Sequence, residues 1–143
     1  MPKFVVLVHA SKESEAGQMP TTEELAEMGA FNKPAVDAGI ILSADGFLPS
    51  STGARVTFHD GGIAEPTVTR GPFALENLVA GYWVVQFGSL DEVVEWAKKI
   101  PFKKGGSVQI RRVAGPEDFG DALTPEIKQQ EEEMRKTVEG RKK

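Results

Sequence analysis

The chain has 143 residues, of which 40% are hydrophobic and 27% are charged, and its formal net charge at pH 7 is −4. This length is typical of one domain with its own core, and the negative charge argues against nucleic acid or an anionic membrane as a partner. The absence of cysteine excludes disulfides, thiolate metal sites and a cysteine nucleophile, and it favours a cytoplasmic location.

The first predicted elements are a strand and a helix. Lys3–His9 is apolar on both faces and rich in β-branched residues, which predicts a central strand covered from two sides. The apolar run is far shorter than the ~18 residues of a membrane span, and we expect neither a span nor a signal peptide. A loop up to Pro20 follows, and Thr21 with Glu24 forms a capping box that starts a helix. Pro34 lies inside the helical pattern, so we expect a kink or an early end just before it.

A second strand and a hairpin come next. Ile40–Leu48 is predicted to be a strand that loosens around Asp45. Residues 54–59 alternate in polarity, and the turn signal Asp60-Gly61-Gly62 sends the chain back. These features predict a β-hairpin over residues 54–70.

The second half of the chain repeats the order strand, helix, strand. Val79–Phe87 is a strong strand, Ser89 begins a capping box for a helix that Pro101 stops, and Ser107–Val113 is the last strand. The complete order is β-α-β, hairpin, β-α-β. It predicts an α+β fold of the ferredoxin-like split βαβ type with an inserted hairpin.

Two of the predicted strands, Lys3–His9 and Val79–Phe87, are apolar on both faces. Two helices cover only one face of such a sheet, so the second face needs another cover. A second copy of the chain is the usual cover. We therefore predict a homodimer at micromolar concentration.

The composition shifts beyond Ala114, and Thr124-Pro125 begins a final charged helix with proline at its first position. Its apolar stripe is narrow, consisting of Leu123, Ile127, Met134 and Val138. A stripe this narrow is weakly stable alone. The segment 121–143 is therefore either a solvated arm or an arm that lies across a partner subunit, and it is also a possible contact for another protein partner.

His9 and Asp45 are the candidate catalytic residues. His9 ends the first strand and can act as a general acid or base, and Asp45 could orient it. The alternative is that His9 is a strand-end residue bonded to the backbone or a loop. The other histidine, His59, lies next to a turn and is expected to be a surface residue.

The stretch Arg70-Gly71-Pro72-Phe73 is the candidate ligand-binding segment. The rigid turn lets Arg70 and Phe73 flank the start of the next strand, where the cation could clamp the carboxylate of a small organic acid. Apolar walls of the predicted pocket would come from Phe73, Phe47, Phe31 and Trp83. The alternative is that Phe73 fills the core and Arg70 pairs with Asp45 or Glu76.

Other site classes lack their sequence patterns. The two histidines have no metal-ligand spacing, so no metal is expected. No nucleophile elbow and no phosphate-binding loop is present, and we expect no cofactor. The basic stretch at residues 103–112 has no interleaved aromatic residues, so nucleic-acid binding is not expected.

Several segments, in order, resemble the YCII-related superfamily in its DGPF-domain branch. They are ESEAGQMPTTEELAEMGAFN (13–32), AGIILSADGFLPSS (38–51), TRGPFALENLVAGYW (69–83), SLDEVVEWAKKIP (89–101) and GPEDFG (115–120). This chain has Arg70 where the namesake motif carries aspartate. The resemblance assigns residues 1–120 to the family domain and implies a ferredoxin-like dimer of the α+β barrel type, with the two sheets facing each other.

The resemblance also implies a family whose biochemical role is mostly unassigned, so two functions stay open. One is a small-molecule site, with acid-base or lyase-type chemistry at a histidine–aspartate pair in some relatives. The other is a regulatory or interaction module linked with an extracytoplasmic-function sigma factor. An enclosed pocket would favour the first function and a flat open surface the second.

Overall fold

The computed structural model describes residues 1–141, in two compact units: Met1–Arg112 and a C-terminal unit that begins at Val113. The strands of the first unit are β1 (Lys3–His9), β2 (Ile41–Gly46), β3 (Ala54–Thr57), β4 (Thr67–Arg70), β5 (Val79–Gln86) and β6 (Val108–Arg112). Its helices are α1 (Lys12–Glu15), α2 (Thr22–Asp37) and α3 (Leu90–Ala97). The predicted strands and the two main helices are therefore present in the predicted order.

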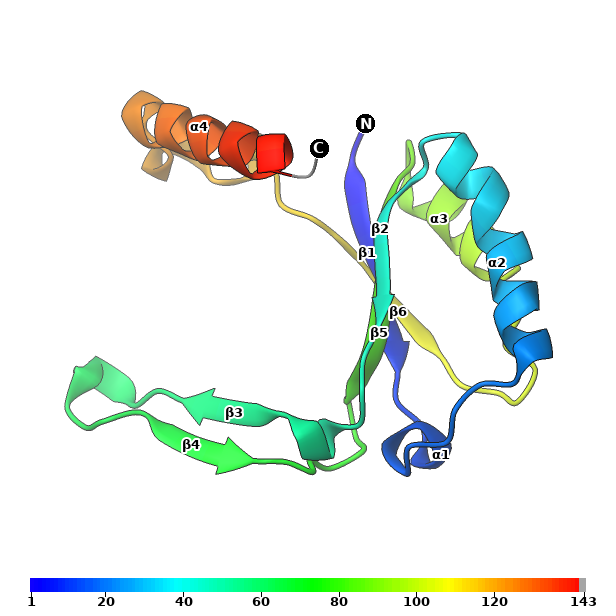
Figure 1. Ribbon diagram of the computed structural model, residues 1–143. Coiled ribbons are helices and arrows are strands. Elements are labelled where there is room, and N and C mark those ends of the chain that lie inside the picture. Colours follow the sequence, from blue (N-terminus) through cyan, green and yellow to red (C-terminus); the bar gives the residue numbers. More distant parts are fainter. Residues whose placement is uncertain (142–143) are drawn as a thin grey trace. The chain divides into compact units, whose positions relative to one another are not determined.

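The main sheet has four strands in the order β2-β5-β1-β6, and every neighbouring pair is antiparallel. β1 and β2 are joined through α2 and are separated in the sheet by β5, and β6 lies on the other side of β1 (Figure 1). This is the split βαβ arrangement. The α+β, ferredoxin-like prediction is confirmed, and the β3–β4 hairpin is inserted between β2 and β5.

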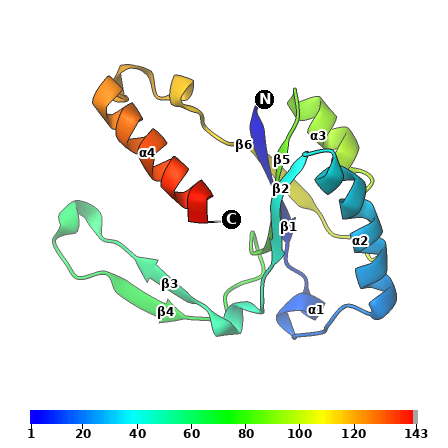
Figure 2. The same cartoon turned by 45° about the horizontal axis from the view of Figure 1, so that its top comes forward.

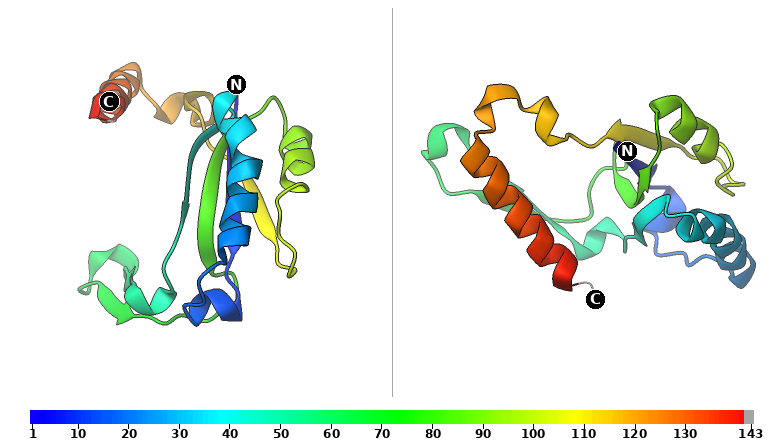
Figure 3. Two further views of the ribbon diagram at one scale, coloured as in Figure 1. Left: turned by 45° about the vertical axis from the view of Figure 1, so that its right-hand side comes forward. Right: turned by 90° about the horizontal axis from the view of Figure 1, so that it is seen from above.

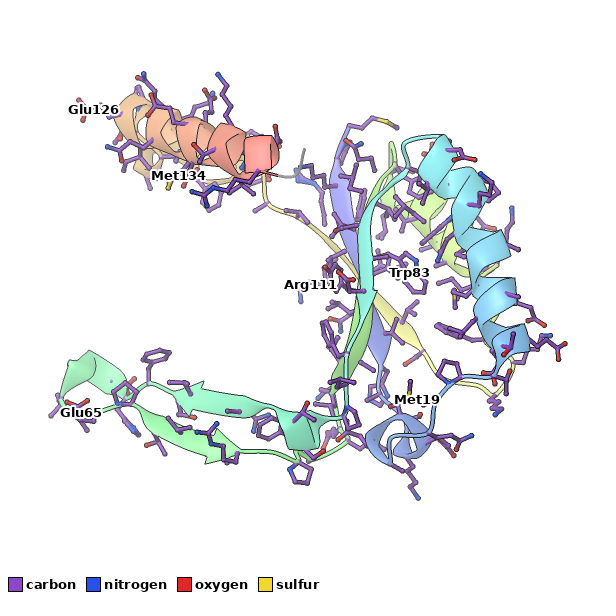
Figure 4. All side chains as sticks on the ribbon, in the orientation of Figure 1. Met19, Glu65, Trp83, Arg111, Glu126 and Met134 are labelled. Atoms are coloured by element: carbon purple, nitrogen blue, oxygen red, sulfur yellow. The ribbon has the colours of Figure 1, made fainter. Side chains whose placement is uncertain are left out.

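Helices α2 and α3 cover one face of this sheet (Figure 2). The core lies between them and the strands, and its buried members are Phe4, Val6, Trp83, Val85, Val93 and Ile100. They come from alternate positions of β1 and β5 and from one side of the α3 segment, as the periods of strand and helix require. Trp83 lies on this helix-covered side (Figure 4).

The opposite face of the sheet has no cover within the first unit. The intervening residues Val5, Leu7 and Val84 are half-buried there, and Arg111 points away from the helices on the same side (Figure 4). The apolar character predicted for both faces therefore holds for β1, whereas β6 contributes polar residues to the open face.

Two local predictions about residues 10–37 are corrected by the structure, namely the early end of the helix before Pro34 and a loop without a helix up to Pro20. The alternative of a kink at Pro34 stays a prediction. α2 begins at its Thr21 cap as predicted, but it runs through Pro34 to Asp37 without ending early. Proline removes only one backbone hydrogen-bond donor from the helix. The next residue, Ala35, is buried, and its packing stabilises the last turn. The predicted loop before α2 contains α1, which Ser11 and Ser14 cap reciprocally.

The β3–β4 hairpin extends from the sheet on the side opposite α2 and α3 (Figure 3). All eight residues of its two strands are exposed. The register pairs Val56 with Val68 and Thr57 with Thr67. The hairpin prediction is confirmed. Within the predicted range 54–70, only the four residues at each end are paired as strands.

In the C-terminal unit, α4 (Pro125–Arg141) begins with proline at its first position as predicted, and the Thr124 hydroxyl accepts a hydrogen bond from the Ile127 amide at 3.3 Å. No described residue of this helix is buried. The side chains of Ile127, Met134 and Val138 are 43%, 60% and 52% exposed.

Candidate functional site

A cleft of about 290 Å³ opens at the end of β1, on the side of α1 and the start of α2. Apolar side chains in its lining are Val8, Met19 and Phe102, and the polar groups include His9 and Lys104. The strand end is fixed because the His9 amide donates to the Ser107 carbonyl at 3.1 Å. His9 is therefore an exposed side chain on a well-anchored backbone.

A second cleft, of about 400 Å³, lies on the neighbouring surface at the same strand end. Its lining includes Leu7 and Gln109, which are register partners in β1 and β6, and the turn at residues 77–79. His9 lines this cleft as well as the first. A backbone irregularity between Val8 and His9 interrupts the ladder at this point, and such bulges commonly re-aim a side chain.

The wall of the first cleft is held by local hydrogen bonds and one ion pair. The Thr21 hydroxyl and Glu24 cap α2 reciprocally. Lys103 pairs with Glu27 at 2.8 Å, which ties the loop after α3 to α2. Gly105 and Gly106, with φ of 84° and 108°, allow the chain to turn back into β6. The cleft therefore lies between tethered segments.

Asp45 lies on β2, and its carboxylate accepts a hydrogen bond from the Tyr82 hydroxyl at 2.8 Å. This hydrogen bond is the main cause that raises the pKa of Tyr82 above its ordinary value of 10.0, with desolvation and the negative charge of Asp45 acting in the same direction. The Phe47 ring packs beside Tyr82 at 5.9 Å between centroids. The structure thus gives Asp45 a tyrosine partner that the sequence prediction did not name.

Phe31 and Trp83 lie in the core on the helix-covered face. Their ring centroids are 6.4 Å apart, and both pack against Trp96. The indole N–H of Trp83 donates to the Asn32 amide oxygen at 3.0 Å. These two predicted pocket residues are therefore separated by the sheet from Asp45 and Phe47.

Arg70 and Phe73 lie at the base of the hairpin. The Phe73 amide donates to the Ser50 hydroxyl at 2.9 Å, and the Arg55 guanidinium stands 4.2 Å from the centroid of the Phe73 ring. Arg70 ends β4 opposite Ala54 and is exposed. Within residues 1–141 it forms no ion pair with Asp45 or Glu76.

Gly71 explains why the chain turns so sharply after Arg70. Its amide donates to the Gly53 carbonyl at 3.0 Å, and a Cβ at this position would lie 1.8 Å from the Ser50 carbonyl oxygen. Only glycine fits so close an approach of two backbones. Ser50 in turn donates its backbone N–H to the Glu15 carboxylate at 2.9 Å and its hydroxyl to the same group.

The predicted site residues therefore fall into four places. His9 lies at the clefts, Asp45 and Phe47 surround Tyr82 on the open face, and Arg70 and Phe73 belong to the hairpin base, whereas Phe31 and Trp83 are core residues. The sequence prediction missed Tyr82, although its position one residue before Trp83 already places it on the other face of β5. The sequence prediction also missed Lys104 in the lining of the first cleft, because the glycine-rich loop that carries it matches no known motif.

Within residues 1–141, no three histidine, cysteine, aspartate or glutamate side chains gather to hold a metal ion. None of the helices described combines the length and hydropathy that a membrane crossing requires.

Comparisons with known proteins point to one family. The model of the YCII-related domain matches residues 3–116, and no curated protein matches the chain. Among solved structures, 5-chloro-2-hydroxyhydroquinone dehydrochlorinase (TftG) from Burkholderia phenoliruptrix AC1100, in complex with 2,5-dihydroxybenzoquinone, is 15% identical. The alignment covers 78% of this chain and 93% of that one with a TM-score of 0.44, a likeness that assigns no activity here.

Proposed function

The chain belongs to the YCII-related domain family, and we propose that it is a homodimer that binds a small organic acid at the end of its sheet. One observation carries the proposal: His9 lines both clefts that open at this sheet end. The Arg-Gly-Pro-Phe segment supports a finer placement in the DGPF branch, and the lack of cysteine supports a cytoplasmic location.

The chemistry of the first cleft supports an acid as the ligand. The apolar side chains of Val8, Met19 and Phe102 suit a hydrocarbon body, while Lys104 and His9 supply N–H donors for a carboxylate. Its volume of about 290 Å³ suits a molecule of the size of a benzoate or a short fatty acid. Arg70 and Phe73 line neither cleft, and in the proposal they form a separate ligand contact at the hairpin base.

The open face of the sheet supports the dimer. It exposes parts of Val5, Leu7 and Val84 beside the polar pair Asp45 and Tyr82. A sheet face of this composition is usually covered by a further layer, and a second copy provides one.

Acid-base chemistry on the bound ligand falls to His9, the exposed imidazole at the clefts. In the proposal Asp45 acts by orienting the hydroxyl of Tyr82, which is the hydrogen-bond partner that the structure gives it. In the proposal His9 therefore has two roles: it contributes an N–H donor to ligand binding, and it is the acid or base of a turnover step.

Thermal-shift and calorimetric titrations with benzoate, hexanoate and their uncharged amides test the site. We expect the wild-type chain to bind a carboxylate and His9→Ala to lose at least about 10-fold in affinity, as for loss of a hydrogen bond to a charged group. His59→Ala is the matched control, because this second histidine lies on the hairpin. Binding that is unchanged in His9→Ala would refute the role of His9, and no binding of any carboxylate would refute the site.

A second proposal is that α4 makes the chain an interaction module, and the family resemblance suggests an extracytoplasmic-function sigma factor as its partner. The exposed apolar stripe of Ile127, Met134 and Val138 supports it. Co-purification of the full chain with such a sigma factor from the same genome tests it. Met134→Lys with Val138→Lys should abolish the complex, and a complex that forms equally well with this variant would refute the role of α4.

A further inference from the structure

The β3–β4 hairpin has one uncovered apolar face. Val56 and Val68 are directly paired in the ladder, and strand alternation places Phe58 on the same face as Val56. Their side chains are 50%, 56% and 78% exposed, and Ile63 at the turn is 89% exposed. An apolar surface of this kind on a soluble domain usually marks an interaction site.

The other face of the hairpin is polar and has partners of its own. Thr57 and Thr67 are paired on it, and His59 hydrogen-bonds the Thr67 hydroxyl at 2.9 Å. Arg55, also on this face, stacks on the Phe73 ring. The hairpin is thus amphipathic, and only its polar face is satisfied within the chain.

The base of the hairpin is fixed to the rest of the first unit. Gly71 bonds to Gly53 across the base, and Ser50 links Glu15 of α1 to the Phe73 amide. The hairpin leaves the sheet on its open side, away from α2 and α3 (Figures 1 and 3). Anything that covers the open face of the sheet therefore lies beside the hairpin.

We propose that the apolar face of the β3–β4 hairpin packs on a second copy of this chain, the same copy that covers the open sheet. The inference rests on the homodimer proposed above and adds the element that completes its interface. By the two-fold symmetry of such a dimer, each copy would present one hairpin to the other. Arg70, which shares the face of Val68, would then face the second copy.

The open face of the sheet is too small to form a stable dimer interface by itself. Four strands spaced about 4.8 Å apart and about six residues long present a face of about 400 Å². A stable interface buries about 800 Å² on each partner. The open sheet alone falls well short of this area, and the adjoining hairpin is an apolar surface of the first unit that can extend it.

The charge at the tip argues against a membrane as the occupant. Asp60 and Glu65 flank the exposed Ile63, and Glu65 stands at the tip (Figure 4). Carboxylates at this position are repelled by anionic lipid. A second copy of the chain, with a sheet face beside the hairpin, fits the surface better.

Sedimentation velocity over a range of concentrations tests the inference with two matched double variants. Val56→Glu with Val68→Lys puts an opposite-charge pair on the apolar face and leaves the net charge unchanged. Thr57→Glu with Thr67→Lys makes the same change on the polar face, one position along the ladder. We expect the first variant to raise the dimer Kd about 100-fold, as when two apolar side chains leave an interface, and the second to change it less than about threefold.

The outcomes distinguish a failure of the hairpin contact from a failure of the homodimer on which it rests. If the wild type is a dimer and both variants keep its Kd, the hairpin role is overturned and the dimer stands. If the wild type is a monomer, the homodimer fails and the hairpin inference fails with it. A fluorophore on Phe58→Cys, unique in this cysteine-free chain, provides a second readout: its emission should shift to the blue on dimerisation, whereas a label on Thr57→Cys should not shift.

Discussion

The chemistry of the open face is concentrated in one pair of residues, Tyr82 and Asp45. The tyrosine hydroxyl donates to the carboxylate, and the Phe47 ring packs beside it. Because Asp45 accepts this hydrogen bond, the side chain that it orients in the structure is Tyr82, whereas the sequence predicted His9. The pair orients a phenol on the face where we place the second copy.

Tyr82 offers a direct titration, because it is the single tyrosine of the chain. Its pKa is raised by the hydrogen bond to Asp45, so absorbance at about 295 nm should show a midpoint above the ordinary value of about 10. Asp45→Ala should return the midpoint toward the ordinary value, and Asp60→Ala, a control at the hairpin tip, should not. A wild-type midpoint at or below the ordinary value would contradict the hydrogen bond.

The sign of the linked stability effect follows from the raised pKa. The folded state holds the phenol proton more tightly than the unfolded state does. The contribution of this pair to stability is therefore complete below about pH 10 and is lost as the pH rises through the folded pKa.

Alternation along β5 shows how far single residues could be predicted. The sequence places Trp83 and Tyr82 on opposite faces of the strand, and the structure agrees. The sequence could not reveal which face the helices cover, so the pocket prediction took the core residues Trp83 and Phe31 together with Asp45. Which face of the sheet the helices cover depends on tertiary packing, and the alternation of residues along a strand does not predict it.

At the scale of elements, the connections decide where the hairpin stands. Gly71 lies against the Ser50 backbone, and Ser50 is in turn hydrogen-bonded to Glu15 of α1, so these contacts join the hairpin base to α1. The rigid turn that the sequence suggested to be part of a ligand clamp therefore has a structural role first.

Gly71→Ala should lower the free energy of unfolding by about 1–3 kcal/mol, because its Cβ would meet the Ser50 backbone and force the two segments apart. Gly46→Ala is the matched control, since a Cβ there meets nothing within 4 Å, and it should stay within about 0.5 kcal/mol. Urea unfolding at one protein concentration measures both variants. Equal stability of the two would show that the close approach at Gly71 is not required.

Element boundaries were predictable where capping residues mark them. Thr21 and Ser89 start α2 and α3 as their sequence patterns indicate, whereas Pro34 did not end α2. A proline signals a local cost, but the burial of Ala35 and the packing of Phe31 compensate for it. Such compensation depends on contacts that are distant in sequence, which the local pattern does not contain.

At the scale of the whole molecule, the first unit has two layers, the sheet and the helices on one of its faces, and no layer of this unit covers the other face. Helices cover one face of the sheet, and the other face carries half-buried valines and a leucine next to polar groups. The β-α-β order of the sequence was sufficient to predict the sheet topology, because split βαβ units leave few ways to order four strands. The first unit supplies no cover for this open face, and we propose that a second copy of the chain supplies it.

The most direct test of that cover is the molar mass of the wild-type chain by light scattering at low-micromolar concentration. If a second copy covers the open face, the measured mass is twice that of the 15.5 kDa chain. This mass should stay the same on dilution until the protein concentration approaches the dimer Kd. A mass of 15.5 kDa at every concentration would contradict the homodimer and the hairpin contact.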